Sequence, residues 1–473
     1  MLRLHDTATG TVRPLELRDP GRVSMYVCGP TVYDVPHLGH GRFALVFDVL
    51  RRYLRFAGLE VRYVSNITDI DDKIIARAAA EGRSAAEVAE EFEAVWFAAM
   101  DALGVEHPDA VPHATAYVAD MVALVGALVD VGAAYETSDG VYLSVERIEG
   151  YGLLARQSLE SLRAGARVEP GEEKRSPLDF ALWKKARAGE PSWPSPWGPG
   201  RPGWHTECVV MSLDLLGEGF DLHGGGIDLA FPHHENERAQ AVGLHRRFAC
   251  HWVHNGWVTV EGEKMSKSLG NYTSLTDLLA RADARAYRLL VLRAHYRSPI
   301  EVTPATVDQA ERSLARLDEL ARRFGLDPAL GALDAAGAAG AGADPGAVAA
   351  FTARMDDDLD TPGALSGLFE LARAAHAAAD RGDTDAAGRL ATTVAVLAGA
   401  LGLTLHGEGS VMVGGGAGGE LDAATSALAA ERDAARAARH FARADELRAE
   451  LEEQGWVVED GPEGTRLRRR PGA

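Results

Sequence analysis

Cysteine is scarce in this chain of 473 residues, which contains only Cys28, Cys208 and Cys250. So few cysteines exclude a scaffold held together by disulfides and leave metal binding or catalysis as their open roles. Long apolar runs are also lacking, because no stretch approaches the roughly 18 apolar residues of a membrane span. The first residues, Met-Leu-Arg-Leu-His, lack the apolar core of a signal peptide. We therefore expect a cytoplasmic protein with no membrane partner.

Positive charge is in short supply as well. The chain has 49 lysines and arginines against 69 aspartates and glutamates, a formal net charge of −20. This balance argues against indiscriminate binding of nucleic acid, which requires a basic surface, but it leaves room for a local basic patch. With 46% apolar and 25% charged residues, the composition is typical of a globular protein long enough for several domains.

The most informative stretch is a short apolar run followed by a turn that contains histidine and glycine. Residues 23–28 predict a buried strand that ends at Gly29, and residues 39–57 predict a helix with one apolar side. His37 and His40 lie where this helix begins. A helix N-terminus that follows a loop is a natural anion site, and imidazoles can donate hydrogen bonds to phosphoryl oxygens. The pattern alone also suits a purely structural turn.

A second predicted strand, at residues 61–65, leads into a polar loop at residues 66–73, so the two strands and the helix between them form a β-α-β unit. Further strands are predicted at residues 220–223 and 249–253, and a helix with proline in its first turn at residues 232–243. We therefore expect an α/β fold with a Rossmann-like, doubly wound parallel sheet whose ligand lies at the loops after the strands.

The remaining segments differ in composition. Helices are predicted between residues 74 and 131, with a break near Gly104, and a strand at residues 141–145. A stretch rich in proline and glycine, residues 191–203, lies in what we interpret as an insertion between the two halves of the sheet. The chain beyond this sheet is predicted to be helical. Two segments rich in alanine and glycine are predicted linkers: residues 331–346 and 407–419.

Cys208 and the cluster His-His-Glu-Asn-Glu that ends at Glu237 indicate a metal site. On a helix, His233 and Glu237 are four residues apart and face the same way. With Cys28 and Cys208 they would supply two thiolates, an imidazole and a carboxylate, which suits zinc. These ligands come from three separate segments, expected to end near strand termini, unlike the paired knuckles of a zinc finger. The spacing leaves an alternative open, in which both cysteines are buried small apolar residues and the acidic helix is solvated.

Two further segments offer contacts for a nucleotide. A triplet of glycines ending at Gly226 allows a close backbone approach, and Asp228 could accept hydrogen bonds from ribose hydroxyls, although three glycines also form ordinary turns. Lys264 and Lys267 lie in the segment Lys-Met-Ser-Lys-Ser. Two lysines on a short loop could neutralise charge on transferring phosphoryl groups, and the alternative is an ordinary charged turn.

Together with the turn at His37 and His40, the lysine segment resembles the two signatures of class I aminoacyl-tRNA synthetases. The likeness covers nearly the whole chain, and its motifs are similar to those of the cysteinyl-tRNA synthetase family. Leu38 departs from the isoleucine usual in the first signature, with no evident chemical consequence. The motifs are Cys-Gly-Pro-Thr-Val-Tyr-Asp from Cys28, Asn-Ile-Thr-Asp-Ile-Asp-Asp-Lys from Asn66, Pro-Gly-Arg-Pro-Gly-Trp-His-Thr-Glu-Cys to Cys208, and Phe-Pro-His-His-Glu-Asn-Glu to Glu237.

The resemblance implies a ligase that joins L-cysteine to tRNA(Cys) in two steps. Cysteine and ATP first give cysteinyl-adenylate and pyrophosphate, and the 3′ end of the tRNA then attacks the activated carboxyl. One Zn²⁺ would be held by Cys28, Cys208, His233 and Glu237, and Mg²⁺ would accompany ATP. The implied roles are catalysis by His37, His40, Lys264 and Lys267, ATP binding by Gly39, His40, Gly226, Asp228 and Lys267, and amino-acid binding by Gly29, Thr68, Trp204, His205 and His223. For His223, a packed histidine at a strand end is an open alternative.

The implied zinc would explain how cysteine is selected over serine. A hydrophobic pocket discriminates poorly between near-isosteres, whereas zinc binds a thiolate strongly and a hydroxyl weakly. No hydrolytic editing domain is then needed, and the insertion at residues 133–200 is too short to be one. Because four protein ligands fill a tetrahedral site, the substrate sulfur must enter as a fifth ligand or displace one, with Glu237 as the first candidate.

Contact with tRNA is expected from the helical part and the tail. Four arginines in the tail recur at helical spacing, and Trp456 could stack on an unpaired base. The alternative is a solvated face, because acidic residues offset the arginines of the tail. The four arginines are Arg432, Arg436, Arg439 and Arg443.

We expect a monomer divided into seven segments. These are 1–132, the first half of the Rossmann catalytic domain; 133–200, an inserted connective segment; 201–260, the second half with the zinc site; 261–310, the mobile lysine loop and stem-contact region; 311–406, a helical tRNA-binding bundle; 407–420, a flexible linker; and 421–473, a C-terminal anticodon-recognition module.

Two other functions compete with this interpretation. A cysteine ligase that joins cysteine to a glucosaminyl-inositol amine in mycothiol synthesis would share the zinc and lysine motifs, but it is expected to be shorter and to lack the tail. A paralogue that only binds RNA would bind tRNA without releasing pyrophosphate. The reacting groups named above are all present in the sequence, which argues against the second alternative.

Overall fold

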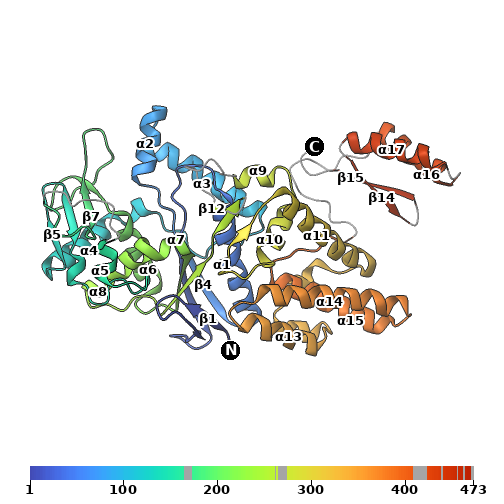
Figure 1. Ribbon diagram of the computed structural model, residues 1–473, viewed down its shortest axis with the longest axis horizontal. Helices are drawn as coiled ribbons and strands as arrows, with labels where there is room; N and C mark the ends of the chain where they lie inside the picture. Colours follow the sequence, from blue (N-terminus) through green and yellow to red (C-terminus); the bar gives the residue numbers. More distant parts are fainter. Residues whose placement is uncertain are drawn as a thin grey trace. The chain divides into compact units, whose positions relative to one another are not determined.

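The computed structural model describes residues 1–164, 173–260, 263–264, 274–407, 423–437, 440–454, 456–461 and 464–469 (Figure 1). The chain forms two compact units. The first contains Met1–Thr276 and Ala284–Gly407, and the second contains Asp277–Asp283 and Glu408–Ala473. Among the described residues, none of the helices is long and apolar enough to cross a membrane.

A four-stranded parallel sheet forms the centre of the first unit. Its strands are β3 (Arg22–Val27), β4 (Glu60–Ser65), β9 (Leu222–Gly226) and β10 (His251–Asn255), and they lie in the order β10-β9-β3-β4. The chain leaves β3 toward β4 on one side and β9 toward β10 on the other. The gap between the carboxyl ends of β3 and β9 is therefore the topological switch point at which such sheets bind ligands.

Helix α1 (Leu38–Phe56) connects β3 to β4 and packs against both β4 and β9. It begins and ends one residue before the predicted helix, and the predicted apolar side is buried, with Leu45, Leu50 and Leu54 all nearly inaccessible to solvent. A Cβ atom at Gly224 would lie only 2.3 Å from the ring of Phe47. The glycines after the predicted strand 220–223 thus extend β9 beneath α1, so the alternative in which they form an ordinary turn does not apply.

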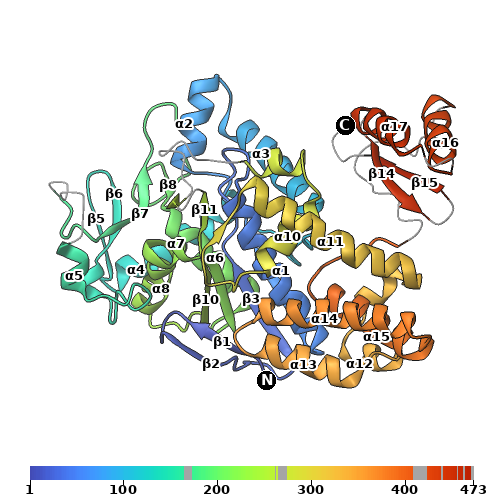
Figure 2. The same ribbon diagram turned by 45° about the vertical axis from the view of Figure 1, so that its right-hand side comes forward.

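Three long helices follow β4, namely α2 (Asp72–Glu81), α3 (Ala85–Ala102) and α4 (Val118–Asp130). The predicted break near Gly104 is confirmed, since this glycine has a positive φ of 65° just beyond the end of α3. An antiparallel sheet comes next, and Figure 2 shows its strands side by side. The strand predicted at residues 141–145 stops at Leu143, because Val145 begins a 3₁₀ turn. The strands are β5 (Ala134–Glu136), β6 (Gly140–Leu143), β7 (Phe180–Lys185) and β8 (Gly200–Pro202).

The segment between β8 and β10 is more helical than the sequence indicated. Helix α6 (Trp204–Leu216) precedes β9, and α7 (Ile227–Leu229), a π-helical turn at Ala230–His234 and α8 (Glu235–Gly243) follow it. Within the π-helical turn only Phe231 is non-helical, with an extended φ of −142° and ψ of 131°, so the helical path resumes at residue 232 and continues into α8. This agrees with the helix predicted at residues 232–243.

A bundle of helices completes the first unit. Leu314, Leu317 and Leu320 are buried on one face of the helix Pro304–Phe324, as the periodicity predicted. The linker predicted at residues 331–346 is wrong, because this segment contains a short helix that buries Ala338. Small residues allow close packing here, so the alanines and glycines of this segment indicate a packed contact instead of a flexible linker. The helices are α10 (Ala284–Leu292), α11 (Pro304–Phe324), α12 (Ala335–Gly340), α13 (Pro345–Asp356), α14 (Thr361–Asp380) and α15 (Thr384–Ala400).

The second unit contains two helices and a β-hairpin in its described part: α16 (Ala423–Ala437), α17 (Phe441–Glu453), β14 (Trp456–Gly461) and β15 (Gly464–Arg469). The predicted linker 407–419 lies, apart from Gly407, outside the described residues. The other elements of the chain are β1 (Arg3–Asp6), β2 (Thr11–Pro14), α5 (Leu159–Ala164), β11 (Val258–Val260), β12 (Glu263–Lys264), α9 (Leu275–Leu279) and β13 (Ile300–Glu301).

Candidate active site and metal centre

The four predicted metal ligands meet beside the switch point of the central sheet. Cys28 directly follows β3, and its backbone N–H donates to the carbonyl of Gly224 on β9 at 3.2 Å. Cys208 lies in the second turn of α6, and not near a strand terminus as expected. His233 belongs to the π-helical turn and Glu237 to the first turn of α8, so their four-residue spacing still brings them together.

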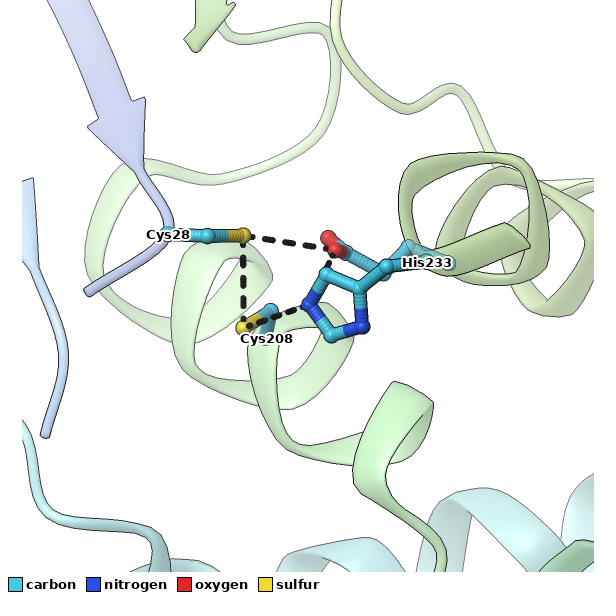
Figure 3. A group of neighbouring side chains, drawn as sticks. Cys28, Cys208 and His233 are labelled. Carbon is cyan, nitrogen blue, oxygen red and sulfur yellow. Dashed lines mark hydrogen bonds and ion pairs between the residues drawn. The ribbon is translucent and has the colours of Figure 1, made fainter. Parts of the chain in front are cut away.

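The donor atoms of these residues are as close as ligands of one ion. The Cys28 and Cys208 sulfurs are 3.5 Å apart, and Nε2 of His233 lies 3.7 Å from the Cys208 sulfur (Figure 3). Oε1 of Glu237 lies 3.3 Å from the Cys28 sulfur and 3.0 Å from Nε2 of His233. Tetrahedral zinc with bonds of about 2.0–2.3 Å separates its ligands by about 3.3–3.8 Å. The donor set and its spacing therefore fit zinc.

All four ligands are buried. Burial raises the pKa of both cysteine thiols, and the pKa of Cys28 lies well above its ordinary value. Burial also lowers the pKa of His233 well below its ordinary value. Two thiols and a carboxylate in one buried cluster are unfavourable in their ionised forms unless a cation neutralises them. The electrostatics of the cluster thus favour a bound cation.

Two further histidines hold these ligands in place. Nε2 of His223 lies 2.7 Å from Oε2 of Glu237, and Nδ1 of His205 lies 2.9 Å from Nδ1 of His233. Such second contacts orient metal ligands and select the tautomer of a ligating histidine. In this arrangement His223 would orient Glu237, and His205 would orient His233. A second possible ligand set, Cys28 and Glu237 with His223 and His234, also has its donor atoms within 4.8 Å of one another.

The remaining residues predicted to bind the amino acid lie close to the cluster. Trp204, about one-third exposed, stacks on His233 with ring centroids 4.1 Å apart. The N–H of Gly29 donates to Oδ1 of Asn66 at 2.9 Å, and Nδ2 of Asn66 contacts Oγ1 of Thr68 at 3.2 Å. A Cβ atom at Gly29 would lie 1.7 Å from the Asn66 carbonyl oxygen, so this position requires glycine.

Sequence reasoning missed two polar residues of this site. Asn66 joins Gly29 to Thr68, and the buried Glu207 accepts a hydrogen bond from Oγ1 of Thr68 at 2.8 Å. Burial raises the pKa of Glu207 well above its ordinary value. Both residues lie inside the motifs that carried the resemblance, so a closer reading of those motifs could have identified them.

The predicted histidine turn forms the N-terminus of α1. Nδ1 of His37 accepts from the N–H of His40 at 3.2 Å, and Nδ1 of His40 accepts from the N–H of His37 at 3.3 Å. This reciprocal arrangement is a capping box built from two imidazoles. The two rings stack with centroids 3.7 Å apart, and Trp96, another residue that the sequence did not indicate, makes a T-shaped contact with His40.

The other predicted residues are less completely described. Gly226 ends β9, and Asp228 lies in the turn that follows it. Lys264 belongs to β12, whereas Lys267 and Arg439 lie outside the described residues. The exposed arginine stripe is not formed as predicted: Arg432 is buried, and Arg443 pairs with Glu431 and Glu446. The side chains of Arg436 and Trp456 are half-buried.

Three regions of the chain match known protein families. Residues 14–312 match the family described as the class I (C) tRNA synthetase catalytic domain. Residues 350–406 match the DALR domain, and residues 418–468 match the cysteinyl-tRNA ligase anticodon binding domain. The first match contains the central sheet, the second includes α14 and α15 of the helical bundle, and the third lies within the second unit.

Similar proteins span the full chain. Cysteine–tRNA ligases of Thioalkalivibrio sulfidiphilus and Alkalilimnicola ehrlichii are each 48% identical over 99% of this chain and 100% of theirs. Among solved structures, Mycobacterium tuberculosis methionyl-tRNA synthetase with methionyl-adenylate has a TM-score of 0.57 at 16% identity, covering 80% of this chain and 89% of that one. The leucyl enzyme of Agrobacterium radiobacter K84, in complex with tRNA, has the same TM-score at 13% identity, covering 82% and 85%. These structures share the fold, and the chain belongs to the cysteine–tRNA ligase family of class I aminoacyl-tRNA synthetases.

Proposed function

We propose that the protein activates L-cysteine with ATP, releasing pyrophosphate, and transfers the cysteinyl group to the 3′ end of tRNA(Cys). The observation that carries this proposal is the position of the buried Cys-Cys-His-Glu cluster beside the capped N-terminus of α1, at one switch point. A site for a thiol and a site for phosphates are then adjacent, as the first step requires. The match of residues 418–468 to an anticodon binding domain supports tRNA as the acceptor.

The two histidines of α1 are suited to ATP. Because Nδ1 of His37 and Nδ1 of His40 each accept from a backbone N–H, the proton of a neutral ring lies on Nε2. Each ring then donates through Nε2, which is the form required by a phosphate oxygen. The helix N-terminus adds its own attraction for anions. In this proposal Gly39, Gly226 and Asp228 contact the nucleotide, while Lys264 and Lys267 with Mg²⁺ stabilise the pyrophosphate as it leaves.

Cys28, Cys208, His233 and Glu237 would hold Zn²⁺. When bound, the ion supplies a strong preference for a thiolate over a hydroxyl at the substrate side chain. The chain's own residues complete the site, since Trp204 covers His233 while Gly29 and Thr68 line the adjacent backbone turn. His205 and His223 act on the ligands instead of on the substrate.

The remaining proposals concern the assembly. The protein acts as a cytoplasmic monomer, with residues 133–200 as the insertion, residues 261–310 as the lysine loop and stem-contact region, residues 311–406 as a helical tRNA-binding bundle, and residues 421–473 recognising the anticodon. Within this last module we retain Arg436, Arg439, Arg443 and Trp456 as candidate contacts. Arg432 is left out because its side chain is buried.

The deciding experiment supplies labelled cysteine, ATP, Zn²⁺ and Mg²⁺ to the full chain, with tRNA or glucosaminyl-inositol in parallel reactions. We expect acid-precipitable label with tRNA and no labelled sugar amine. Transfer to the sugar amine would identify a mycothiol-type ligase. Binding of tRNA without pyrophosphate release would identify a paralogue that only binds RNA.

A further inference from the structure

A buried tyrosine outside every predicted motif contacts the turn that carries the two histidines. Tyr287 lies in α10 and is 1% exposed. Its hydroxyl donates to the carbonyl oxygen of Leu38 at 2.6 Å. Leu38 is the first residue of α1 and lies between His37 and Gly39. The contact thus reaches the part of α1 to which the proposed function assigns the phosphates.

The tyrosine ring also packs tightly on the same turn. A Cβ atom at Gly41 would lie 3.0 Å from Cε1 of Tyr287 and 3.1 Å from the methyl carbons of Leu275. The N–H of Leu275 donates to the carbonyl of Pro36 at 2.8 Å. Leu275 and Tyr287, which follow the lysine segment in the chain, therefore pack on the start of α1, and a side chain at position 41 would crowd both.

The Leu38 carbonyl controls the direction of a particular N–H group. The carbonyl of Leu38 and the N–H of Gly39 belong to one planar peptide unit, so holding the oxygen holds the hydrogen. The first N–H groups of a helix lack partners within the helix and point toward an incoming anion. Fixing the Leu38–Gly39 peptide consequently fixes one of the donors that would meet a phosphate.

We propose that Tyr287 is a positioning residue for ATP, which sets the orientation of the Leu38–Gly39 peptide through its hydrogen bond to the Leu38 carbonyl. This inference rests on the proposed function, because it requires that ATP binds at the start of α1. Tyr287 does not touch substrate. It acts through its hydrogen bond to the backbone of Leu38 and through the packing of its ring on Gly41.

The chemistry of the site keeps this hydroxyl a donor. Burial raises the pKa of Tyr287, so the phenol stays protonated at neutral pH. The nearby guanidinium of Arg42 opposes this effect without reversing it. Arg42 itself donates to the carbonyls of Tyr296 and Ser298, which ties the same turn of α1 to the segment after α10.

The test removes only the hydroxyl, by Tyr287→Phe in the full chain. The matched control is Tyr53→Phe, because Tyr53 is also buried, lies in α1, and donates its hydroxyl to Asp356 at 2.8 Å, more than three turns from the histidines. ATP–pyrophosphate exchange gives the KM values for ATP and cysteine, and thermal unfolding reports the cost to the fold. We expect Tyr287→Phe to raise the KM for ATP about fivefold, as loss of one hydrogen bond implies, and to leave the KM for cysteine unchanged.

A second variant makes the test independent of the hydroxyl. Gly41→Ala should displace the Tyr287 ring from its position against residue 41 and raise the KM for ATP in the same way. In the double variant, the effects of Gly41→Ala and Tyr287→Phe on this KM should be less than additive. Tyr53→Phe should lower the unfolding temperature and leave both KM values unchanged. An unchanged KM for ATP in Tyr287→Phe, or equal rises for ATP and cysteine, would overturn the inference. Absence of exchange in the unmodified protein would overturn the proposed function, and this inference with it.

Discussion

His223 and Glu237 lie side by side in the interior, with Nε2 of His223 2.7 Å from Oε2 of Glu237 and neither side chain exposed to solvent. The other carboxylate oxygen of Glu237 faces Cys28 and His233. One carboxylate thus joins the cluster of predicted metal ligands to β9, with one oxygen at His223 and the other at Cys28 and His233.

This arrangement predicts that His223→Ala weakens zinc binding without removing a ligand. Loss of a contact that orients a ligand typically lowers metal affinity about 10- to 100-fold. Competition with a chromogenic chelator measures the change. His251→Ala is the control, since His251 is also buried but contacts the carbonyl of Leu4. Equal affinity in the His223 variant and the unmodified protein would mean that Glu237 is held by other contacts.

Replacing one thiol should affect zinc directly. We expect Cys208→Ser to lose most of its zinc and to raise the KM for cysteine, because a hydroxyl is a poor ligand for zinc. Metal analysis of the purified protein and pyrophosphate exchange provide the two measurements. The exposed Cys250 supplies the control, and Cys250→Ser should retain its zinc. Full zinc occupancy in Cys208→Ser would remove this residue from the ligand set.

The two steps of the reaction should be separable along the chain. A protein that ends at Gly407 lacks most of the second compact unit and the whole region similar to an anticodon binding domain. We expect it to retain ATP–pyrophosphate exchange and to charge tRNA at least about tenfold more slowly, because each phosphate or base contact contributes to affinity. Equal loss of both activities would show that the second unit is required for folding.

A buried ion pair connects α1 to α10 and should dominate local stability. Arg288 and Asp48 are 2.5 Å apart and almost inaccessible to solvent. Burial alone would raise the pKa of Asp48, but Arg288 and Arg52 lower it below its ordinary value. Arg288→Leu leaves the carboxylate buried without this partner and should cost about 3–5 kcal/mol of unfolding free energy.

The exposed pair of Arg22 and Glu60 provides the comparison for this variant. Both side chains are about 70% exposed, and Arg22→Leu should cost less than about 1 kcal/mol. Denaturant titration of the two variants measures the difference. Similar losses in both would show that Arg52, which already lies 2.9 Å from Asp48, compensates the carboxylate without Arg288.

Acid should destabilise the fold through a buried histidine. Burial lowers the pKa of His251 to about 4, from an ordinary value of 6.5. Between these values the unfolded chain binds the proton and the folded chain does not, so stability falls as pH falls from about 6.5 to about 4, by up to ~1.4 kcal/mol per pH unit. We expect His251→Gln to flatten this part of the pH profile of unfolding free energy, and His245→Gln, at an exposed position, to leave it unchanged.

Several features of the protein follow from local sequence patterns. The apolar run of β3, the amphipathic spacing of α1 and the buried face of α11 appear where the sequence predicted them. The parallel α/β architecture also follows, because strands alternating with helices allow few other arrangements. The four predicted metal ligands were named from residue type and from the resemblance, and the structure brings their donor atoms together.

Other features depend on partners distant in the sequence, and only the tertiary structure decided them. The glycines of β9 continue the strand by pairing with β10, with Phe47 against Gly224, and Gly331, in the 3₁₀ turn before α12, lies against Gly399 of α15. Arg432 is buried, although its spacing suggested an exposed stripe. His205, His223 and Tyr287 contact His233, Glu237 and Leu38, respectively, each of them on another segment of the chain. The physical reason is the same throughout: local periodicity determines which elements form, whereas a side chain's role depends on which atom of another segment the fold places within hydrogen-bonding distance.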